Sequence, residues 1–240
     1  MAEGEAIKSD PRYRFERWAL NALAFIVLGA RRRLTVVEAG NVPAAGPVIV
    51  LCNHIATMDP PIVGARIQRL DVFYMAKKEA FRRAVARFFL RGFNAFPVTR
   101  HTADRAALEI SLRILREGHV LVIFPEGSRS PDATLGRAYG GVGFLARMSG
   151  APVVPAAIWG SEDVLPKGSI LPRSAHVTIR FGTPVTLAEL SGDGPLPRNR
   201  EATDLLMARV AALLPERYRG VYDGRPLDAD FRRSEPSTAA

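Results

Sequence analysis

Cysteine is almost absent from the sequence, which has Cys52 alone among its 240 residues. A lone cysteine excludes a disulfide within the chain and any metal site built from several thiolates. It also fits a reducing compartment, so we expect a cytoplasmic protein. Cys52 lies at the end of an apolar run, where burial disfavours the reactive thiolate, and we therefore assign it to the core.

The sequence has no apolar run long enough to cross a membrane. Residues 18–30 are apolar apart from Asn21, but a spanning helix needs about 20 such residues. Basic residues flank the run on both sides, which is typical of a helix in the membrane interface. We therefore predict that residues 1–33 form a helical segment associated with the inner face of the cell membrane. A core helix covering the sheet is the alternative, and preceding acidic residues argue against a signal peptide.

Lysine is scarce, so arginine supplies most of the 33 basic residues, which outnumber 24 acidic ones. The formal net charge of +9 favours an anionic partner, such as nucleic acid, lipid headgroups or a phosphorylated substrate. Composition does not choose among these three. The only lysines are Lys8, Lys77, Lys78 and Lys167.

Apolar residues make up 48% of the sequence, enough for one sizeable core. Runs of strand length, mostly apolar at every position, are typical of strands buried on both faces of a parallel sheet. They alternate with helical segments, so we predict a single α/β domain over 34–222, with a mainly parallel sheet flanked by helices. A partly disordered tail follows at 223–240. The predicted strands are 48–52, 72–75, 95–98, 120–124, 153–158 and 177–181.

The helices are placed by apolar spacing and by residues that favour helix ends. For the first helix we predict Thr102 as the N-cap and Gly118 as the stop. Residues 190–199 are rich in glycine and proline, which predicts an exposed loop. The predicted helices are about 103–117, 141–149 and 201–214.

Polar residues follow the first predicted strand. Asp59 precedes Pro60, which predicts an N-cap whose carboxylate faces back toward His54. A carboxylate on one imidazole nitrogen leaves the other as a general base. The sequence has no G-x-S-x-G motif, so the nucleophile is expected to be a hydroxyl of the substrate.

A second cluster, Phe-Pro-Glu-Gly-Ser-Arg-Ser at 124–130, follows another predicted strand. Gly127 lets the backbone approach a ligand closely, and the Arg129 guanidinium suits phosphate. Glu126 is placed to orient this arginine or to bind a polyol. Arg100 and Lys77 follow two further predicted strands.

Four ordered blocks together resemble the glycerolipid acyltransferase superfamily, and most closely its 1-acyl-sn-glycerol-3-phosphate acyltransferase family. The resemblance implies that His54, oriented by Asp59, deprotonates the sn-2 hydroxyl of 1-acyl-glycerol-3-phosphate. That oxygen attacks the thioester of acyl-CoA or acyl carrier protein and gives phosphatidate, without cofactor, metal or acyl-enzyme. The blocks are His54 with Asp59, then 96–100, 124–130 and 153–155.

The resemblance further implies that Lys77, Arg100, Glu126, Gly127 and Arg129 bind the glycerol phosphate of the acceptor. The sequence departs from the family at 138–141, where many members have Phe-Lys before a glycine and this chain has Ala-Tyr-Gly-Gly. An acceptor with another headgroup, either a lysophospholipid or a glycolipid, therefore stays open.

Two functional hypotheses outside the acyltransferase family also remain as alternatives. A thioesterase would use His54 to activate water. A non-catalytic basic module for anionic membrane or nucleic acid would explain only the charge, and no nucleic-acid motif is present, so we expect no nucleic acid partner. The remaining histidines lack metal-ligand spacing and receive no role: His101, His119 and His176.

Overall fold

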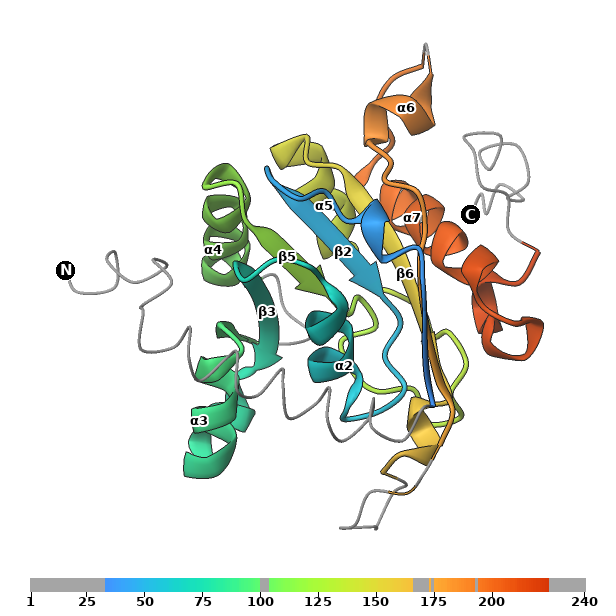
Figure 1. The fold of residues 1–240 in the computed structure, drawn as a ribbon. Coiled ribbons are helices and arrows are strands. Elements are labelled where there is room, and N and C mark those ends of the chain that lie inside the picture. Colours follow the sequence, from blue (N-terminus) through green and yellow to red (C-terminus); the bar gives the residue numbers. More distant parts are fainter. Residues whose placement is uncertain (1–32, 100–103, 166–172, 174, 193, 225–240) are drawn as a thin grey trace, which may run out of the picture.

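The computed structural model describes residues 33–99, 104–165, 173, 175–192 and 194–224 (Figure 1). Almost all of the predicted membrane segment and of the predicted tail lie outside these residues, as does Arg100. Among the described residues, no helix is long and apolar enough to cross a membrane.

A seven-stranded sheet forms the centre of the described domain, in the order β1-β7-β6-β2-β5-β3-β4. Neighbouring strands are parallel except for the antiparallel pair β6 and β7. The predicted α/β domain with a mainly parallel sheet is thus confirmed. The strands are β1 Leu34–Val37, β2 Val48–Cys52, β3 Val72–Lys77, β4 Ala95–Val98, β5 Val120–Ile123, β6 Val153–Trp159 and β7 Val177–Phe181.

Helices cover both faces of this sheet (Figure 1). Helices α4, α5 and α7 pack on the face that carries Ile49 and Leu51, whereas α2 packs on the face that carries Val48 and Val50. All of β2 is buried because alternate side chains enter two cores. The helices are α2 Asp59–Arg66, α3 Ala84–Gly92, α4 Arg105–Arg116, α5 Gly141–Ser149, α6 Leu187–Ser191 and α7 Asn199–Leu213.

Short 3₁₀ helices lie in the connections between these elements. They are η1 Ala39–Asn41, η2 Lys78–Arg82, η3 Ser161–Asp163, η4 Glu216–Tyr218 and η5 Gly220–Tyr222.

Two predicted boundaries differ from the structure. The N-cap of α4 is Asp104 rather than Thr102, because the Asp104 carboxylate accepts the Ala107 amide at 3.0 Å. The predicted loop 190–199 is present between α6 and α7, but its first two residues belong to α6 and Asn199 begins α7. A capping box starts α6, and Leu190 is buried. The predicted stop at Gly118 is confirmed, since this residue has φ +82° just after α4.

The sheet brings the two predicted polar clusters together. Strands β2, β3 and β5 are parallel neighbours, so their carboxyl ends lie at one edge of the sheet. The segment carrying His54 leaves β2 at this edge, Lys77 ends β3, and the segment carrying Arg129 follows β5. Open α/β sheets place ligands at such an edge.

Candidate active site

His54 and Asp59 form a hydrogen-bonded pair. The His54 Nδ1 atom lies 2.8 Å from Asp59 Oδ2, and Asp59 is fully buried while the His54 side chain is 18% exposed. With the Nδ1 proton donated to Asp59, the Nε2 lone pair is free to accept a proton. His54 also lines a cavity of the described domain. The geometry expected of a general base is therefore present.

The Asp59 carboxylate is held by its own turn. Its Oδ2 atom accepts the Ile55 and Ala56 amides, each at 2.7 Å. The predicted N-cap role was wrong: Met58 is the N-cap, and Asp59 is the first residue of α2. The carboxylate captures amides of the turn before the helix, which gives it the same orientation toward His54. Pro60 follows within the first helical turn, where a missing N–H costs nothing.

Ser161 extends the pair to a third side chain. Its hydroxyl donates to Asp59 Oδ1 at 2.5 Å, and the side chain is fully buried. The preceding Gly160 has φ +79°, and a Cβ there would lie 2.0 Å from the His176 carbonyl oxygen. Only glycine fits this turn after β6. We missed Ser161 in the sequence, although a Gly-Ser pair after a predicted strand was the available signal.

Asn53, which was not predicted as a site residue, fixes the end of β2. Its Nδ2 donates to the Ile158 carbonyl and its Oδ1 accepts the Ile158 amide, both at 2.8 Å. The side chain thereby bridges β2 and β6 as a strand residue would. This bridge sets the point at which the chain carrying His54 leaves the sheet.

Glu126 lies behind the cavity wall. Its Oε1 accepts the His54 amide and its Oε2 accepts the Gly136 amide, both at 2.9 Å. Burial raises the pKa of Glu126 to about 7, although these two amides and His54 act in the opposite direction. Glu126 is not among the residues that line the cavity. Its predicted contact with substrate stays a prediction.

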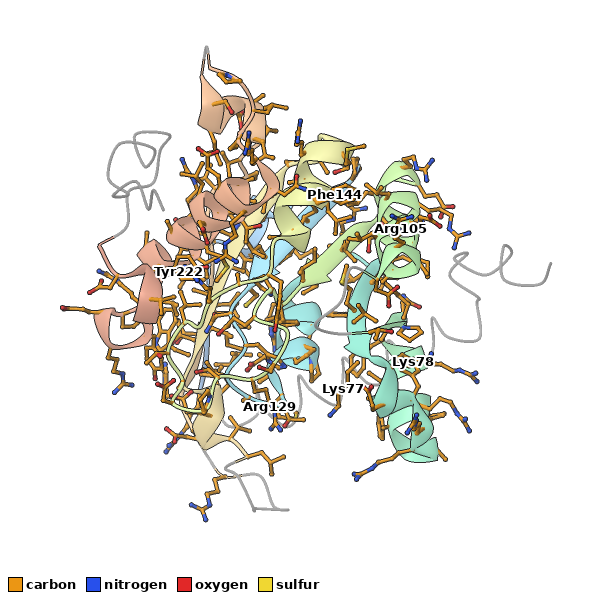
Figure 2. All side chains as sticks on the ribbon, turned by 180° about the vertical axis from the view of Figure 1, so that it is seen from behind. Lys77, Lys78, Arg105, Arg129, Phe144 and Tyr222 are labelled. Atoms are coloured by element: carbon orange, nitrogen blue, oxygen red, sulfur yellow. The ribbon has the colours of Figure 1, made fainter. Side chains whose placement is uncertain are left out.

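Arg129 lies over the segment that carries His54. Its guanidinium donates to Thr57 Oγ1 at 2.7 Å, and both residues line the cavity. Ser130 joins the two segments through its backbone amide, which donates to the His54 carbonyl at 2.8 Å. Lys77 also lines the cavity, from the end of β3. Figure 2 shows Lys77 and Arg129 at the same end of the molecule.

Gly127 lines the cavity between the two segments. It has φ +67°, and a Cβ there would lie 2.9 Å from the Tyr139 ring. The predicted close approach of this backbone to a ligand stays a prediction. Arg100, the remaining predicted phosphate ligand, lies outside the described residues.

The cavity has a volume of about 1860 Å³. We call the part lined by Lys77 and Arg129 its basic end and the part toward Phe144 its apolar end (Figure 2). Lys77 and Arg129 lie at one end of the molecule, and Phe144 lies toward the other (Figure 2). Such a shape accommodates a charged headgroup and a hydrocarbon chain together. Apolar side chains of β3, α4, β5 and α5 are among those that line it: Met75, Ala107, Leu108, Ile123, Val142, Phe144 and Leu145.

Other reactive chemistry near the pair is limited. Burial raises the pKa of the Cys52 thiol well above its usual value, and the charges of Asp59 and Glu126 raise it further. Cys52 is fully buried, which confirms its place in the core. Within the described part of the chain, no three metal-ligating side chains gather in a group that could hold a metal ion.

Comparison with known proteins settles the family. A sequence profile described as Acyltransferase matches residues 33–159. The chain belongs to the acyltransferase family. The family predicted from the four sequence blocks is therefore confirmed, and the chain is an acyltransferase enzyme.

Its relatives have a common description. A 1-acyl-sn-glycerol-3-phosphate acyltransferase of Bacillus subtilis is 30% identical over 198 residues, covering 82% of this chain and 96% of the relative. A 1-acyl-sn-glycerol-3-phosphate acyltransferase of Borreliella burgdorferi is 25% identical over 180 residues, covering 70% of this chain and 72% of the relative. The crystal structure of the 1-acyl-sn-glycerophosphate acyltransferase of Thermotoga maritima shares the fold, with a TM-score of 0.59 at 23% identity, covering 84% of this chain and 83% of that one.

Proposed function

We propose that this acyltransferase moves a fatty acyl group from a thioester to the sn-2 hydroxyl of 1-acyl-glycerol-3-phosphate, with His54 as general base, and so produces phosphatidate. The observation that carries the proposal is the 2.8 Å contact between His54 and buried Asp59 at a cavity with a basic end and an apolar end. The names of the relatives support the same acceptor.

The reaction begins with proton removal. His54 Nε2 takes the proton of the acceptor hydroxyl as its oxygen attacks the thioester carbonyl carbon. Asp59 stabilises the imidazolium that forms, and the amides of Ile55 and Ala56 together with Ser161 keep its carboxylate in place. The tetrahedral intermediate then collapses, the C–S bond breaks, and the imidazolium returns its proton to the thiolate. No side chain of the enzyme is acylated.

The basic end of the cavity positions the acceptor. A phosphate held by Arg129 and Lys77, with Arg100 as a further ligand implied by the sequence, brings the glycerol hydroxyl toward His54. Binding energy from the phosphate, which does not react, thus orients the group that does. Glu126 acts indirectly in this scheme, since it anchors the backbone of His54.

The apolar end takes the acyl chain of a substrate. Residues of β5 and α5, including Ile123 and Leu145, line it with hydrocarbon. Acyl-CoA and acyl carrier protein both present a thioester on a flexible arm, so both are candidate donors. We also propose that the enzyme works as a peripheral protein on the inner face of the cell membrane, where its acceptor resides.

The decisive experiment measures thiol release from palmitoyl-CoA with and without 1-oleoyl-lysophosphatidate, with phosphatidate followed by mass spectrometry. Release that requires the acceptor and disappears in His54→Ala supports the proposal. His176→Ala is the matched control, because this histidine bonds Thr35 at 3.0 Å and does not line the cavity. Release without acceptor indicates a thioesterase, and activity retained in His54→Ala refutes the general base.

A different acceptor is a second candidate. Tyr139 lines the cavity beside Gly127, at a position where many family members carry lysine. A tyrosine lacks the charge that attracts phosphate but can bond a sugar or another headgroup hydroxyl. A panel of lysophospholipids and glycolipids distinguishes the candidates, because preference for a phosphate-free acceptor over lysophosphatidate would exclude the first.

A further inference from the structure

Helix α3 presents an exposed apolar pair to solvent. Phe88 and Phe89 are 54% and 41% exposed, and their rings meet edge to face at 5.7 Å. Exposed phenylalanines are costly in water, and two adjacent ones indicate a surface that another phase or molecule covers. Other large apolar side chains that are exposed in the described domain stand singly: Leu70, Tyr139, Met148, Leu196 and Val221.

Basic residues are frequent in the chain segment that carries this pair. The segment 77–92, here called the α3 surface, has Glu79 as its sole acidic residue. Its six basic residues are all exposed, so its net charge is strongly positive. Figure 1 shows α3 at the periphery, at the end of the sheet where β3 terminates. The basic residues are Lys77, Lys78, Arg82, Arg83, Arg87 and Arg91.

The same segment forms part of the cavity wall. Ala86 and Leu90, one helical turn apart on α3, line the cavity, and so do Ala80 and Arg83 just before them. Phe88 and Phe89 do not line it. The α3 surface therefore faces solvent on one side and the substrate cavity on the other.

We propose that the α3 surface docks on an anionic phospholipid bilayer, with Phe88 and Phe89 inserted below the headgroups. The cations of this surface that do not line the cavity then contact lipid phosphates: Lys78, Arg82, Arg87 and Arg91. Amphipathic helices with aromatic and basic faces bind membranes in this way. A lipid substrate then reaches the cavity along Ala86 and Leu90 without crossing water. This last step rests on the proposed function, whereas the docking does not.

A bilayer accounts for the whole surface better than an acidic protein does. Cations alone would attract an acidic carrier protein, but paired exposed phenylalanines add nothing to such electrostatic steering. In a bilayer the two features act together, since the rings leave water and the charges meet anionic headgroups. An acidic protein partner is therefore an outcome that the experiments below can reveal.

The first experiment places an environment-sensitive fluorophore at residue 88 of the full-length chain. Cys52 is fully buried, so the label attaches to the thiol introduced by Phe88→Cys. On vesicles of equal parts phosphatidylcholine and phosphatidylglycerol, we expect a blue shift and quenching by spin-labelled lipid. The matched control is Met148→Cys on α5, whose parent side chain is 59% exposed. No shift at residue 88, or an equal shift at both sites, overturns the proposal.

The second experiment measures acyl transfer to an acceptor in vesicles and to a short-chain acceptor dispersed as monomers. We expect Phe88→Ser/Phe89→Ser and Arg87→Gln/Arg91→Gln each to lose about tenfold activity on vesicles, and to retain activity on the monomer. Arg147→Gln/Met148→Ser is the matched control on α5, and it should retain both activities.

The outcomes separate the docking from the proposed function. Equal loss on vesicles and monomers refutes docking, because the variants would then damage the enzyme itself. Loss confined to reactions with acyl carrier protein as donor refutes the bilayer in favour of a protein partner. If wild type acylates neither acceptor, the proposed function fails, while the fluorescence at residue 88 still decides the docking.

Discussion

Ser161 donates a 2.5 Å hydrogen bond to the Asp59 oxygen that His54 does not contact. The two donors therefore lie on opposite sides of one buried carboxylate, which restricts its rotation. Ser161 touches neither the cavity nor His54 among the described contacts, so we regard it as a positioning residue. Its effect on catalysis passes through Asp59.

Ser161→Ala should lower kcat by about tenfold with little change in KM, because an Asp59 with one donor fewer orients His54 less well. The acid limb of the pH–activity profile should move to higher pH, since that carboxylate holds the imidazolium proton more strongly. Ser111→Ala is the matched control: it is also fully buried and loses a hydrogen bond to a backbone oxygen. A purely structural role for Ser161 predicts an unshifted profile.

Glu126 should give the protein a characteristic pH-dependent stability. Burial raises its pKa from 4.5 to about 7, so the unfolded chain releases this proton at lower pH than the folded protein does. The contribution to stability is therefore complete below about 4.5 and is lost by about 7. This pKa shift changes the free energy of unfolding by at most about 3 kcal/mol.

Chemical denaturation of wild type and Glu126→Gln at a series of pH values tests the predicted pH dependence of stability. The glutamine does not titrate, so the stability of wild type relative to the variant should fall as pH rises through that window and then become constant. Exposed Glu109 provides the control, because Glu109→Gln should leave wild-type pH dependence intact. A constant difference between wild type and Glu126→Gln contradicts the raised pKa.

The helices and strands predicted from sequence are those whose own residues show a clear apolar pattern. Strand β2 was predicted because every position is apolar, which burial on both faces demands. Strand β1 was missed because it is a half-buried strand at the sheet edge, directly after an arginine run. Helix α3 was missed because arginines interrupt its apolar residues, which its exposed position tolerates.

Side-chain contacts within the site were predicted only where both residues share one segment. His54 and Asp59 are five residues apart, so a turn geometry could be argued locally. Ser161 reaches Asp59 from a turn 102 residues later, and only the pairing of β2 with β6 brings the two together. Glu126 was predicted as a site residue from its sequence block. That its two carboxylate oxygens accept the backbone amides of His54 and Gly136 could be seen only in the fold.

Arg129→Gln should raise KM for lysophosphatidate by about tenfold to a hundredfold, the range for losing one charge-assisted phosphate contact. The KM of Arg129→Lys should lie between those of wild type and Arg129→Gln, because lysine keeps the charge without the planar guanidinium. Steady-state kinetics with lysophosphatidate and with phosphate-free monoacylglycerol make the test. Arg105→Gln, at an exposed arginine outside the cavity, serves as the control. An equal effect on both acceptors would show that Arg129 does not act through phosphate.

Gly127→Ala should destabilise the protein by about 1–2 kcal/mol from backbone conformation alone, because φ +67° is costly for any residue with a Cβ. A further cost comes from the Tyr139 ring, which lies 2.9 Å from the position of the new Cβ. The two costs separate in a double-mutant cycle with Tyr139→Ala, measured by denaturation. Removing the ring should relieve the steric cost and leave the conformational one. If Gly127→Ala lowers the free energy of unfolding equally with and without the Tyr139 ring, the ring does not restrict this turn. Other contacts must then hold Tyr139 in the cavity wall.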